Sequence, residues 1–537
     1  MKRLTIYGLS LLLSLLIPGI KKSFAQTMFD PFQLKVEAIP MNGMPAIHSF
    51  SWAKWENKWL LIGGRTNGLH GFQPPFAFPT ANQNTNIYVI DPDSGMVWSI
   101  SATTLPQQTR EHITSSNQQF SQKDSFLYIT GGYGYESNQN MLLTFPAITR
   151  VNVPEVITAI IQQQPLYGFF STNIDERMAV TGGHMVNLNS TFYLVMGHRF
   201  DGRYNPHNGP SFTQTYTESI QSFFIDDSSG LPVIHQYVQS IDTANFHRRD
   251  YNLVPRIFNG NTPGYTAFTG VFQKAVDLPW LSSVDIINGS GVLNSTYEQK
   301  LNQYHTANVS LYDSISGENF ALFFGGMGLY YPDINNLLIV DSMVPFVNSI
   351  TYIRSNSIGT TEGSFSNRMP GYLGSSAEFI PADLQEYDNE VIKLHTLDTG
   401  WTTVGYVVGG IVSDQPNTFM QATGTTWASD TVYRITINRS TVTFLQEQPV
   451  SYLDSFSLFP NPVSQKITVE WQSKQTSHLQ WVIYRADGSK VMESKLKKYG
   501  IGNNQETIQV DTLAPTQYII YFLENGNAVK SLKFIKE

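Results

Sequence analysis

The sequence predicts an all-β protein. Three observations support this prediction: apolar strands that end in glycine recur along the chain, turn motifs separate alternating strands, and no long segment has helical periodicity. A chain of 537 residues is too long for one ordinary domain, so we expect at least two folded units. Hydrophobic residues make up 41% of the chain and charged residues only 14%, which predicts ample cores and a mainly uncharged polar surface.

Charge, cysteine count and missing motifs exclude several functions. The net charge is −8 and no lysine- and arginine-rich cluster lies beyond the N-terminal end, so we expect no nucleic-acid partner. The sequence contains no cysteine, which excludes disulfides, thiolate metal sites and a lipid-anchor cysteine. Motifs of nucleotide-binding proteins, zinc proteases and serine hydrolases are absent, and the aspartate-rich turns have too few ligands for calcium. We therefore predict neither a metal site nor a cofactor.

Residues 1–25 have the pattern of a signal peptide. Lys2 and Arg3 precede an apolar stretch over 4–20 and a cleavage pattern that ends at Ala25. A retained membrane anchor is the alternative, but glycine, serine and proline interrupt a run that is shorter than a spanning helix. We expect export, cleavage after Ala25 and no transmembrane segment in the mature protein.

Six segments of similar layout follow. Each contains an alternating strand, a short turn, an apolar strand that ends in glycine, and then a second hairpin. The first strands are expected over 47–53, 112–120, 178–186, 250–257, 305–312 and 372–380. The apolar second strands end at Gly64, Gly132, Gly197, Gly270, Gly326 and Gly410. Each segment therefore predicts a four-stranded antiparallel sheet, with glycine where a neighbouring sheet crowds the strand end.

These units resemble kelch repeats, whose mark is an apolar strand that ends in a glycine pair. Four units keep the pair, whereas the third and fourth have Met196 and Thr269 before the final glycine, and Trp98 stands where the family places a tryptophan. The resemblance implies a six-bladed kelch-like β-propeller over 26–450, in which radial stacking buries both faces of every sheet. One strand from a chain end must close the ring, and 34–40 and 441–446 are both candidates.

The pattern changes near Ser451. The segments FSLFPNPVSQKITVEW, WVIYRADGSKV and LAPTQYIIYFLENGNAVKSLKFIKE follow in this order, and the last carries Lys530, Lys533 and Lys536 near its end. They resemble the type A sorting domain of type IX secretion cargo from Bacteroidota, although the family's glycine two residues before Tyr518 is missing. The resemblance implies a sorting domain over 451–537 that the type IX machinery recognises. It also implies passage through the periplasm to the medium or the outer cell surface.

The residues of this C-terminal segment predict its fold without the resemblance. Asp487-Gly488 and Asn525-Gly526 are hairpin turn signals between alternating strands, which predicts a small Ig-like antiparallel β-sandwich. An Ig-like structural or glycan-binding module is the alternative function of this segment.

Candidate binding residues gather in loops that we expect on one face of the propeller. They are Arg65, His70, Tyr133, Tyr135, His198, Arg199, Arg203, Tyr204, Arg248 and Tyr330. Aromatic side chains next to arginine and histidine suit stacking on sugars or peptides. The alternative is a solvated hairpin with paired arginines around Arg203, and an ion pair between blades for Arg248. No catalytic residue is identified.

Two functions remain open at this point. The first is a secreted or surface-displayed binding protein that recognises a glycan or a protein. The second is a secreted carbohydrate-active enzyme of the mutarotase or lyase type, which we favour less, and a purely structural surface element is a third possibility. The copper cofactor of galactose oxidase-like kelch enzymes needs a cysteine bonded to a tyrosine, so the sequence excludes it. Perturbed acids and bases near the axis would favour the enzyme, and an aromatic cleft would favour the binding protein.

Overall fold

The structure is a computed structural model of the chain. It describes residues 31–206, 211–333, 337–357, 359–417, 425–438, 452–485, 490–524 and 527–537. The predicted signal peptide lies outside these ranges. Within them, no helix is long and apolar enough to cross a membrane.

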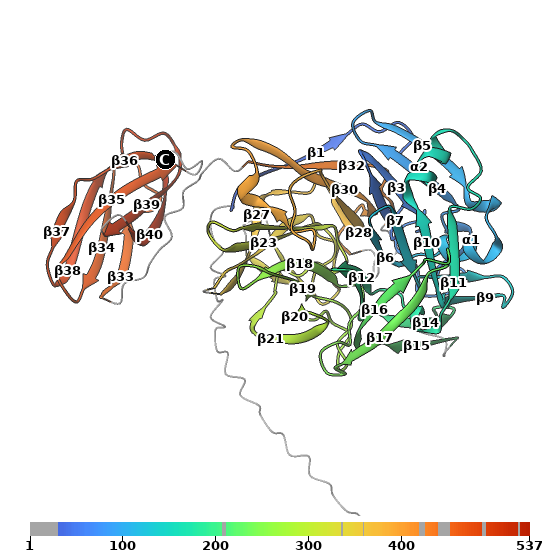
Figure 1. The fold of residues 1–537 in the computed structure, drawn as a ribbon. Coiled ribbons are helices and arrows are strands. Elements are labelled where there is room, and N and C mark those ends of the chain that lie inside the picture. The colour runs from blue at the N-terminus through green and yellow to red at the C-terminus, as the bar shows by residue number, and fades with distance from the viewer. Residues whose placement is uncertain are drawn as a thin grey trace, which may run out of the picture.

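Strands dominate the part before residue 439, where six antiparallel sheets of four main strands follow one another (Figure 1). The first two sheets contain β2 (Ser51–Trp55), β3 (Lys58–Ile62), β4 (Asn86–Asp91) and β5 (Met96–Ser101), and β6 (Gln119–Lys123), β7 (Phe126–Thr130), β10 (Ala147–Asn152) and β11 (Phe170–Ile174). The next two contain β12 (His184–Leu188), β13 (Thr191–Val195), β16 (Ser219–Asp226) and β17 (Val233–Ile241), and β18 (Asn252–Phe258), β19 (Thr262–Phe268), β20 (Ser282–Ile287) and β21 (Ser290–Glu298).

The fifth and sixth sheets each carry one additional strand. The fifth contains β22 (Asn308–Asp313), β23 (Glu318–Phe324), β26 (Ser349–Ser355) and β27 (Thr360–Arg368), with β29 (Ile392–Lys393) beside β22. The sixth contains β28 (Tyr372–Pro381), β30 (Trp401–Ser413), β32 (Val432–Asn438) and β1 (Gln33–Ile39), with β31 (Thr426–Ala428) beside β30. Every predicted glycine-ended strand is the second strand of its sheet.

The N-terminal strand completes the sixth sheet. β1 pairs with β32 in antiparallel register from Gln33↔Asn438 to Ile39↔Val432. Of the two closing strands that the sequence left open, the N-terminal one therefore takes this place. The other candidate, 441–446, lies outside the described residues.

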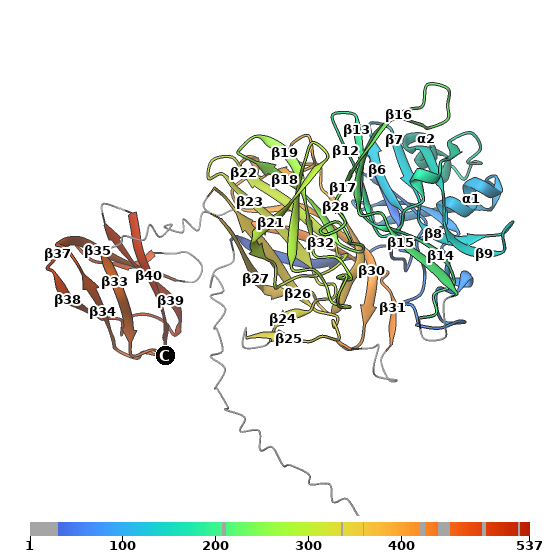
Figure 2. The ribbon, with the colours of Figure 1, turned by 90° about the horizontal axis from the view of Figure 1, so that it is seen from below.

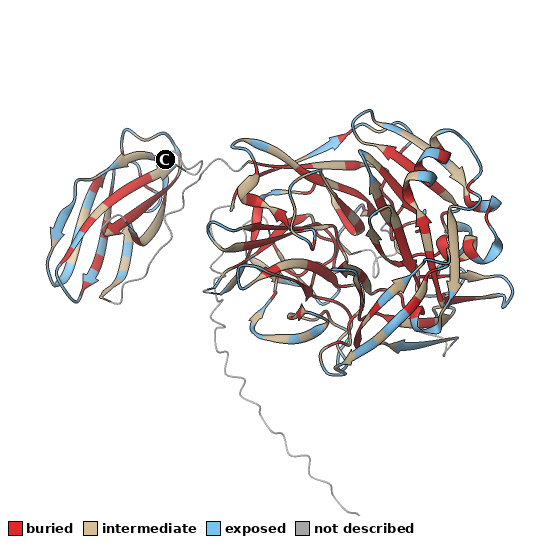
Figure 3. Cartoon of the chain, in the orientation of Figure 1, coloured by how far each residue is buried: buried red, intermediate tan, exposed pale blue. Residues whose placement is uncertain are grey.

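Apolar side chains fill the space between successive sheets. Separate buried clusters join the first sheet to the second, the second to the third, and so on to the sixth, and a further cluster joins the sixth to the first. In this last cluster Trp59 and Leu61 of β3 pack with Val408 of β30. The sheets thus form a closed series, and their buried faces appear as bands in Figure 3.

Within the described residues, three small hairpins and two α-helices connect the strands, together with short 3-10 turns. The hairpins pair β8 (Tyr133–Glu136) with β9 (Met141–Thr144), β14 (His198–Gly202) with β15 (Phe212–Tyr216), and β24 (Tyr330–Pro332) with β25 (Leu338–Val340). Figure 2 shows all three at one end of the sheets, as the prediction of a shared loop face requires. The helices α1 (Gln107–Ile113) and α2 (Val153–Ile161) lie in the second unit.

Several first strands begin later than predicted. The expected strand over 112–120 is in fact the end of α1, a loop, and then β6 from Gln119; β12 likewise begins at His184 instead of 178. The apolar residues before these strands are buried in loops, where they mimic strand alternation. These loops lie at the centre of the closed series of sheets, where they build the candidate site.

The C-terminal segment forms two further antiparallel sheets. One contains β33 (Leu453–Phe459), β34 (Lys466–Ser473) and β38 (Gly502–Gln509). The other contains β35 (Ser477–Arg485), β36 (Lys490–Glu493), β37 (Lys497–Tyr499), β39 (Thr516–Glu524) and β40 (Asn527–Lys536). Trp471, Tyr518 and Phe522 are central to a core that contains only residues of this segment. Both predicted hairpin turns lie outside the described residues.

Candidate functional site

A residue with a left-handed backbone stands in or just before the first strand of each sheet. These residues are Ser49, Asn117, Gly182, Asp250, His305 and Ser376. Backbone hydrogen bonds of 2.7–3.4 Å link them in series: Ser376 donates to His305, Ser49 to Ser376, Asn117 to Ser49, Gly182 to Asn117, and Asp250 to Gly182. Between Asp250 and His305 the Asn252 side chain bridges instead, because it accepts from the Thr306 N–H at 2.9 Å and donates to the Gln303 carbonyl. We call this arrangement the central ring.

Two cavities meet at the central ring. The large pocket has a volume of about 340 Å³ and takes lining residues from the loops of all six sheets. The small pocket has a volume of about 190 Å³. Ser49, Asn117, Asp250 and His305 line both, so the central ring separates one cavity from the other.

One wall of the large pocket is aromatic. The rings of His70 and Phe78 stack with centroids 4.3 Å apart, and Tyr204 meets His70 edge-on at 5.2 Å. His70 and Phe78 belong to the connection between β3 and β4, and Tyr204 to the loop between β14 and β15. Burial lowers the pKa of His70 to about 4, so this ring is neutral at pH 7 and stacks as an uncharged aromatic side chain.

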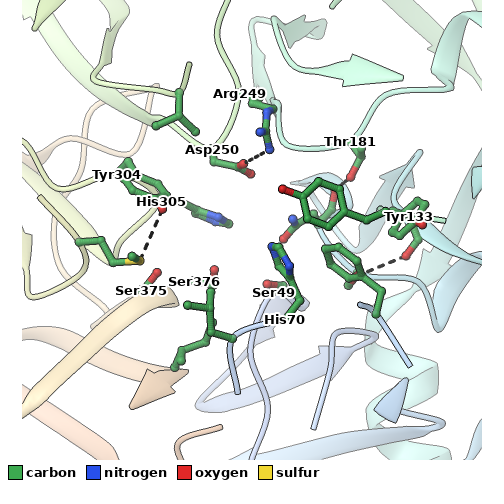
Figure 4. Close-up of a pocket in the computed structure, with 18 of the residues that line it drawn as sticks. Ser49, His70, Tyr133, Thr181, Arg249, Asp250, Tyr304, His305, Ser375 and Ser376 are labelled. Carbon is green, nitrogen blue, oxygen red and sulfur yellow. Dashed lines mark hydrogen bonds and ion pairs between the residues drawn. The ribbon is translucent and has the colours of Figure 1, made fainter. Parts of the chain in front are cut away.

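The opposite side of the pocket is polar. Arg249 donates from Nη1 to Asp250 Oδ2 at 3.0 Å and from Nε to the Tyr216 hydroxyl at 3.0 Å. Figure 4 shows this pair among the side chains that line the pocket, with Tyr304 and His305 near Asp250. The carboxylate and the aromatic face of Phe272, 5.4 Å from the guanidinium, hold Arg249 in place.

His305 is the titratable group at the centre of the ring. Its backbone φ is 37°, and its Nε2 lies 3.8 Å from Glu378 Oε1, a residue of the small pocket. Burial lowers the pKa of His305, but the hydrogen bonding and charge of Glu378, together with the charge of Asp250, outweigh burial and raise it. A strained histidine whose pKa neighbouring carboxylates raise is a candidate proton donor.

The other pocket histidines are held neutral. Burial, with the charge of Arg65, lowers the pKa of His48 to about 3. Burial, with the charge of Arg249, lowers the pKa of His198 well below its ordinary value. The pocket therefore combines neutral imidazoles with one histidine whose pKa is raised.

Comparison with known proteins identifies the C-terminal segment. Residues 457–537 match the family described as "Secretion system C-terminal sorting domain". This segment is a secretion sorting domain. It indicates export by type IX secretion to the cell surface or to the outside, and therefore an interaction with the type IX machinery.

Two solved structures with a similar course of the chain are remote from it in sequence. No curated protein matches the chain. A solved structure described as "Novel fungal alcohol oxidase with catalytic diversity among the AA5 family, in complex with copper" has 9% identity and a TM-score of 0.38, and covers 93% of this chain and 99% of its own. A second, "Structure of YjhT", has 12% identity and a TM-score of 0.42, and covers 75% of this chain and 99% of its own. Neither likeness carries an inference about activity.

The structure brings part of the sequence-predicted site together. Arg65, His70, Tyr133, His198 and Tyr204 line the large pocket. The others lie elsewhere: Tyr135 donates to Asn140 Oδ1 at 2.6 Å, Arg199 pairs with Asp201 and Glu176 at 2.6 and 2.7 Å, Arg203 is exposed, and Tyr330 begins β24.

Arg248 is a structural residue, and its neighbour Arg249 lines the pocket. Arg248 is fully buried and donates to the carbonyls of Thr269 and Ser282, both at 2.7 Å. Sequence reasoning also missed Asp250 and His305. The signal that could have found them is their position, two or three residues before a first strand, which in this fold places them at the centre. No group of three metal-ligating side chains assembles within the described residues.

Proposed function

We propose that the exported protein is a six-bladed kelch-type β-propeller, over about 26–450, that binds a saccharide in the large pocket. The glycine-ended second strands, the closed series of sheets and the closing strand β1 support the propeller. We propose that the sorting domain is an Ig-like sandwich over 451–537, of the type found in Bacteroidota. It would deliver the protein through the periplasm to the cell surface or the medium.

The large pocket is the observation that indicates the class of ligand. Its volume of about 340 Å³ suits a small molecule, so a short glycan fits better than a folded protein. A flat aromatic wall opposite a wall of charged and hydroxyl groups matches a sugar ring, which has an apolar face and a polar rim.

A saccharide panel tests this proposal. Titration calorimetry of the purified protein with neutral and acidic mono- and disaccharides should find at least one that binds. Tyr204→Ala should weaken that binding by tenfold or more, because it removes part of the stacking wall. Tyr330→Ala, outside the pocket, is the matched control and should bind as the wild type does. Absence of any saccharide binding, or equal effects of both substitutions, would contradict the proposal.

A carbohydrate-active enzyme, of mutarotase or lyase type, is the second candidate. His305 favours it, because a histidine next to Glu378 and Asp250 can move a proton to or from a bound sugar. NMR of a bound sugar would show anomer exchange or bond cleavage in the presence of wild-type protein and its loss in His305→Gln. A sugar that binds but is never changed would leave only the binding function.

A further inference from the structure

Two arginines line the large pocket, and they differ in their partners. Arg249 is neutralised by Asp250 at 3.0 Å. Arg65, in contrast, has only neutral partners: its Nε donates to Asn67 Oδ1 at 3.1 Å and its Nη2 to the Pro79 carbonyl at 2.7 Å. No carboxylate among the described residues lies within 4.0 Å of the Arg65 guanidinium.

Part of the Arg65 guanidinium is free to meet a ligand. Its Nη1 makes no hydrogen bond within the described residues, and protein atoms do not fully enclose it. Arg65 is only 3% exposed and lines the large pocket. The free N–H groups therefore face the pocket.

A buried cation without a counter-ion costs free energy. Burial lowers the pKa of Arg65 to about 10. The guanidinium thus stays protonated at pH 7, and neither of the carboxylates that line the pocket, Asp250 and Asp277, pairs with it. Guanidinium groups bind carboxylates and other oxyanions through charge-assisted hydrogen bonds, often two at once.

The neighbours of Arg65 leave room for an anion. His48 is joined to Arg65 by reciprocal backbone hydrogen bonds of 3.0 Å, and its neutral ring has an enclosed Nε2 without a partner. The Tyr133 hydroxyl is directed away, because it donates to the Gly202 carbonyl at 2.6 Å. In the part of the chain that the structure describes, no carboxylate therefore competes with an anion for the free edge of the guanidinium.

The cation also adjoins the stacking wall. The Arg65 guanidinium lies 5.5 Å from the centre of the Phe78 ring, and the same ring stacks on His70. A sugar ring placed against this wall can therefore extend an acidic substituent to Arg65.

We infer that the large pocket selects acidic saccharides, and that Arg65 binds their carboxylate or sulfate group. This inference rests on the proposed saccharide binding. Asp277, on the lining of the same pocket, would repel an acid in the reverse orientation. The competing explanation is that Arg65 only fixes Asn67 and the loop at Pro79.

Matched pairs of sugars test the inference on the full mature chain. Calorimetry would compare glucuronate with glucose, galacturonate with galactose, and galactose 6-sulfate with galactose, at two salt concentrations. At least one acid should bind tenfold or more tightly than its neutral counterpart, with the preference weaker in high salt. The uronate and sulfate arms show which oxyanion Arg65 takes.

Two variants separate recognition from structure. Arg65→Gln should bind the acid no more tightly than the neutral sugar, whereas Arg199→Gln, whose guanidinium is paired outside the pocket, should keep the wild-type preference. An Arg65→Gln protein that still prefers the acid would overturn the inference. If this variant does not fold, the methyl ester of the bound uronate decides with wild-type protein, because equal binding of acid and ester overturns the inference. Neutral sugars that bind as well as acids also overturn it, and leave the proposed function intact; no binding of any sugar overturns the proposed function itself.

Discussion

A backbone carbonyl near the next sheet restricts the first position of each pair to glycine. Gly325 has φ +65°, and a Cβ there would lie 1.9 Å from the Leu373 carbonyl oxygen; at Gly131 the corresponding distance to Val180 is 1.8 Å. The second glycine then donates its N–H to that same carbonyl, at 2.9 Å in both pairs. The predicted crowding at these strand ends is thus confirmed. Its cause is one carbonyl group, which leaves no room for a side chain on the first glycine and accepts the N–H of the second.

Substitution of these glycines gives the first prediction. Gly325→Ala should destabilise the protein by about 2–5 kcal/mol, since it adds a backbone clash to the cost of a left-handed alanine. Gly317→Ala is the matched control: φ is +71° there and no atom lies within 4 Å of the added Cβ, so the cost should be only about 1–2 kcal/mol. Urea unfolding of both variants measures the difference. Equal losses would mean that the carbonyl contact does not explain the glycine.

Glu362 gives a prediction about pH. This carboxyl is 7% exposed and accepts N–H groups from Lys300 and Leu301 and the Tyr297 hydroxyl. Burial raises its pKa from 4.5 to about 7, against the lowering effect of these hydrogen bonds. The folded state then binds more protons than the unfolded state between these two values, so stability falls as pH rises through this window.

The measurement is the free energy of unfolding from pH 4.5 to 7.5. In Glu362→Gln the decline across the window should be smaller than in the wild type by up to about 3 kcal/mol. Glu37→Gln, on an exposed position of β1, should retain the wild-type decline. If Glu362→Gln leaves the decline unchanged, other groups cause the loss of stability. Glu386 is one such group, because burial also raises its pKa to about 7.

Single residues of the pocket were predictable only where they follow a recognisable strand. Arg65 and His198 come directly after glycine-ended strands, so the sequence indicated their loop and its face. Arg248 and Arg249 are adjacent, and no local pattern says which of them turns to the centre. The left-handed Asp250 and the buried contacts of Arg248 decide this, and both depend on the folded ring.

Among the strands, the apolar second strands were predicted best and the first strands least well. Second strands are buried on both faces and end at glycine, so their sequence is distinctive. The first strands follow segments whose buried residues, such as Ile47 in a loop and Ile113 at the end of α1, look like strand residues. The helix α2 was not predicted, because its buried Val156, Ile157 and Ile160 are β-branched and resemble a strand.

The closing strand β1 gives a prediction at this scale. Leu34 is 3% exposed and packs with residues of the fifth and sixth sheets. Leu34→Ala should cost about 2–4 kcal/mol in the single unfolding transition of the ring, as expected for a buried leucine. Glu37→Ala, an exposed position on the same strand, should cost less than about 0.5 kcal/mol. If Leu34→Ala were as mild as Glu37→Ala, or only loosened the N-terminus, β1 would not hold the ring closed.

For the whole molecule, the sequence indicated two separate units with different tasks. The change of pattern near Ser451 and the ordered motifs after it located the sorting domain, and the family match over 457–537 agrees. The two units have separate cores: Trp471 and Phe522 pack within the C-terminal sheets, and the pocket residues come only from the six sheets before residue 439. The ligand could not be predicted, because loops from all six sheets must assemble before the pocket exists.

Removal of residues 452–537 therefore tests export without disturbing the ring. In a host with a type IX system, the truncated chain should keep its thermal midpoint and its saccharide binding and accumulate in the periplasm, because the predicted signal peptide still directs it across the inner membrane. Fusion of 452–537 to a periplasmic reporter should carry the reporter outside, and the same fusion in a strain without the type IX system should stay inside. Fractionation followed by immunoblotting measures the location in all three cases.

If the C-terminal domain had only a structural role, the opposite pattern would appear: the truncated protein would be less stable and its location would be unchanged. Appearance of the truncated ring in the medium at the wild-type level would show that the C-terminal domain is not what exports this protein.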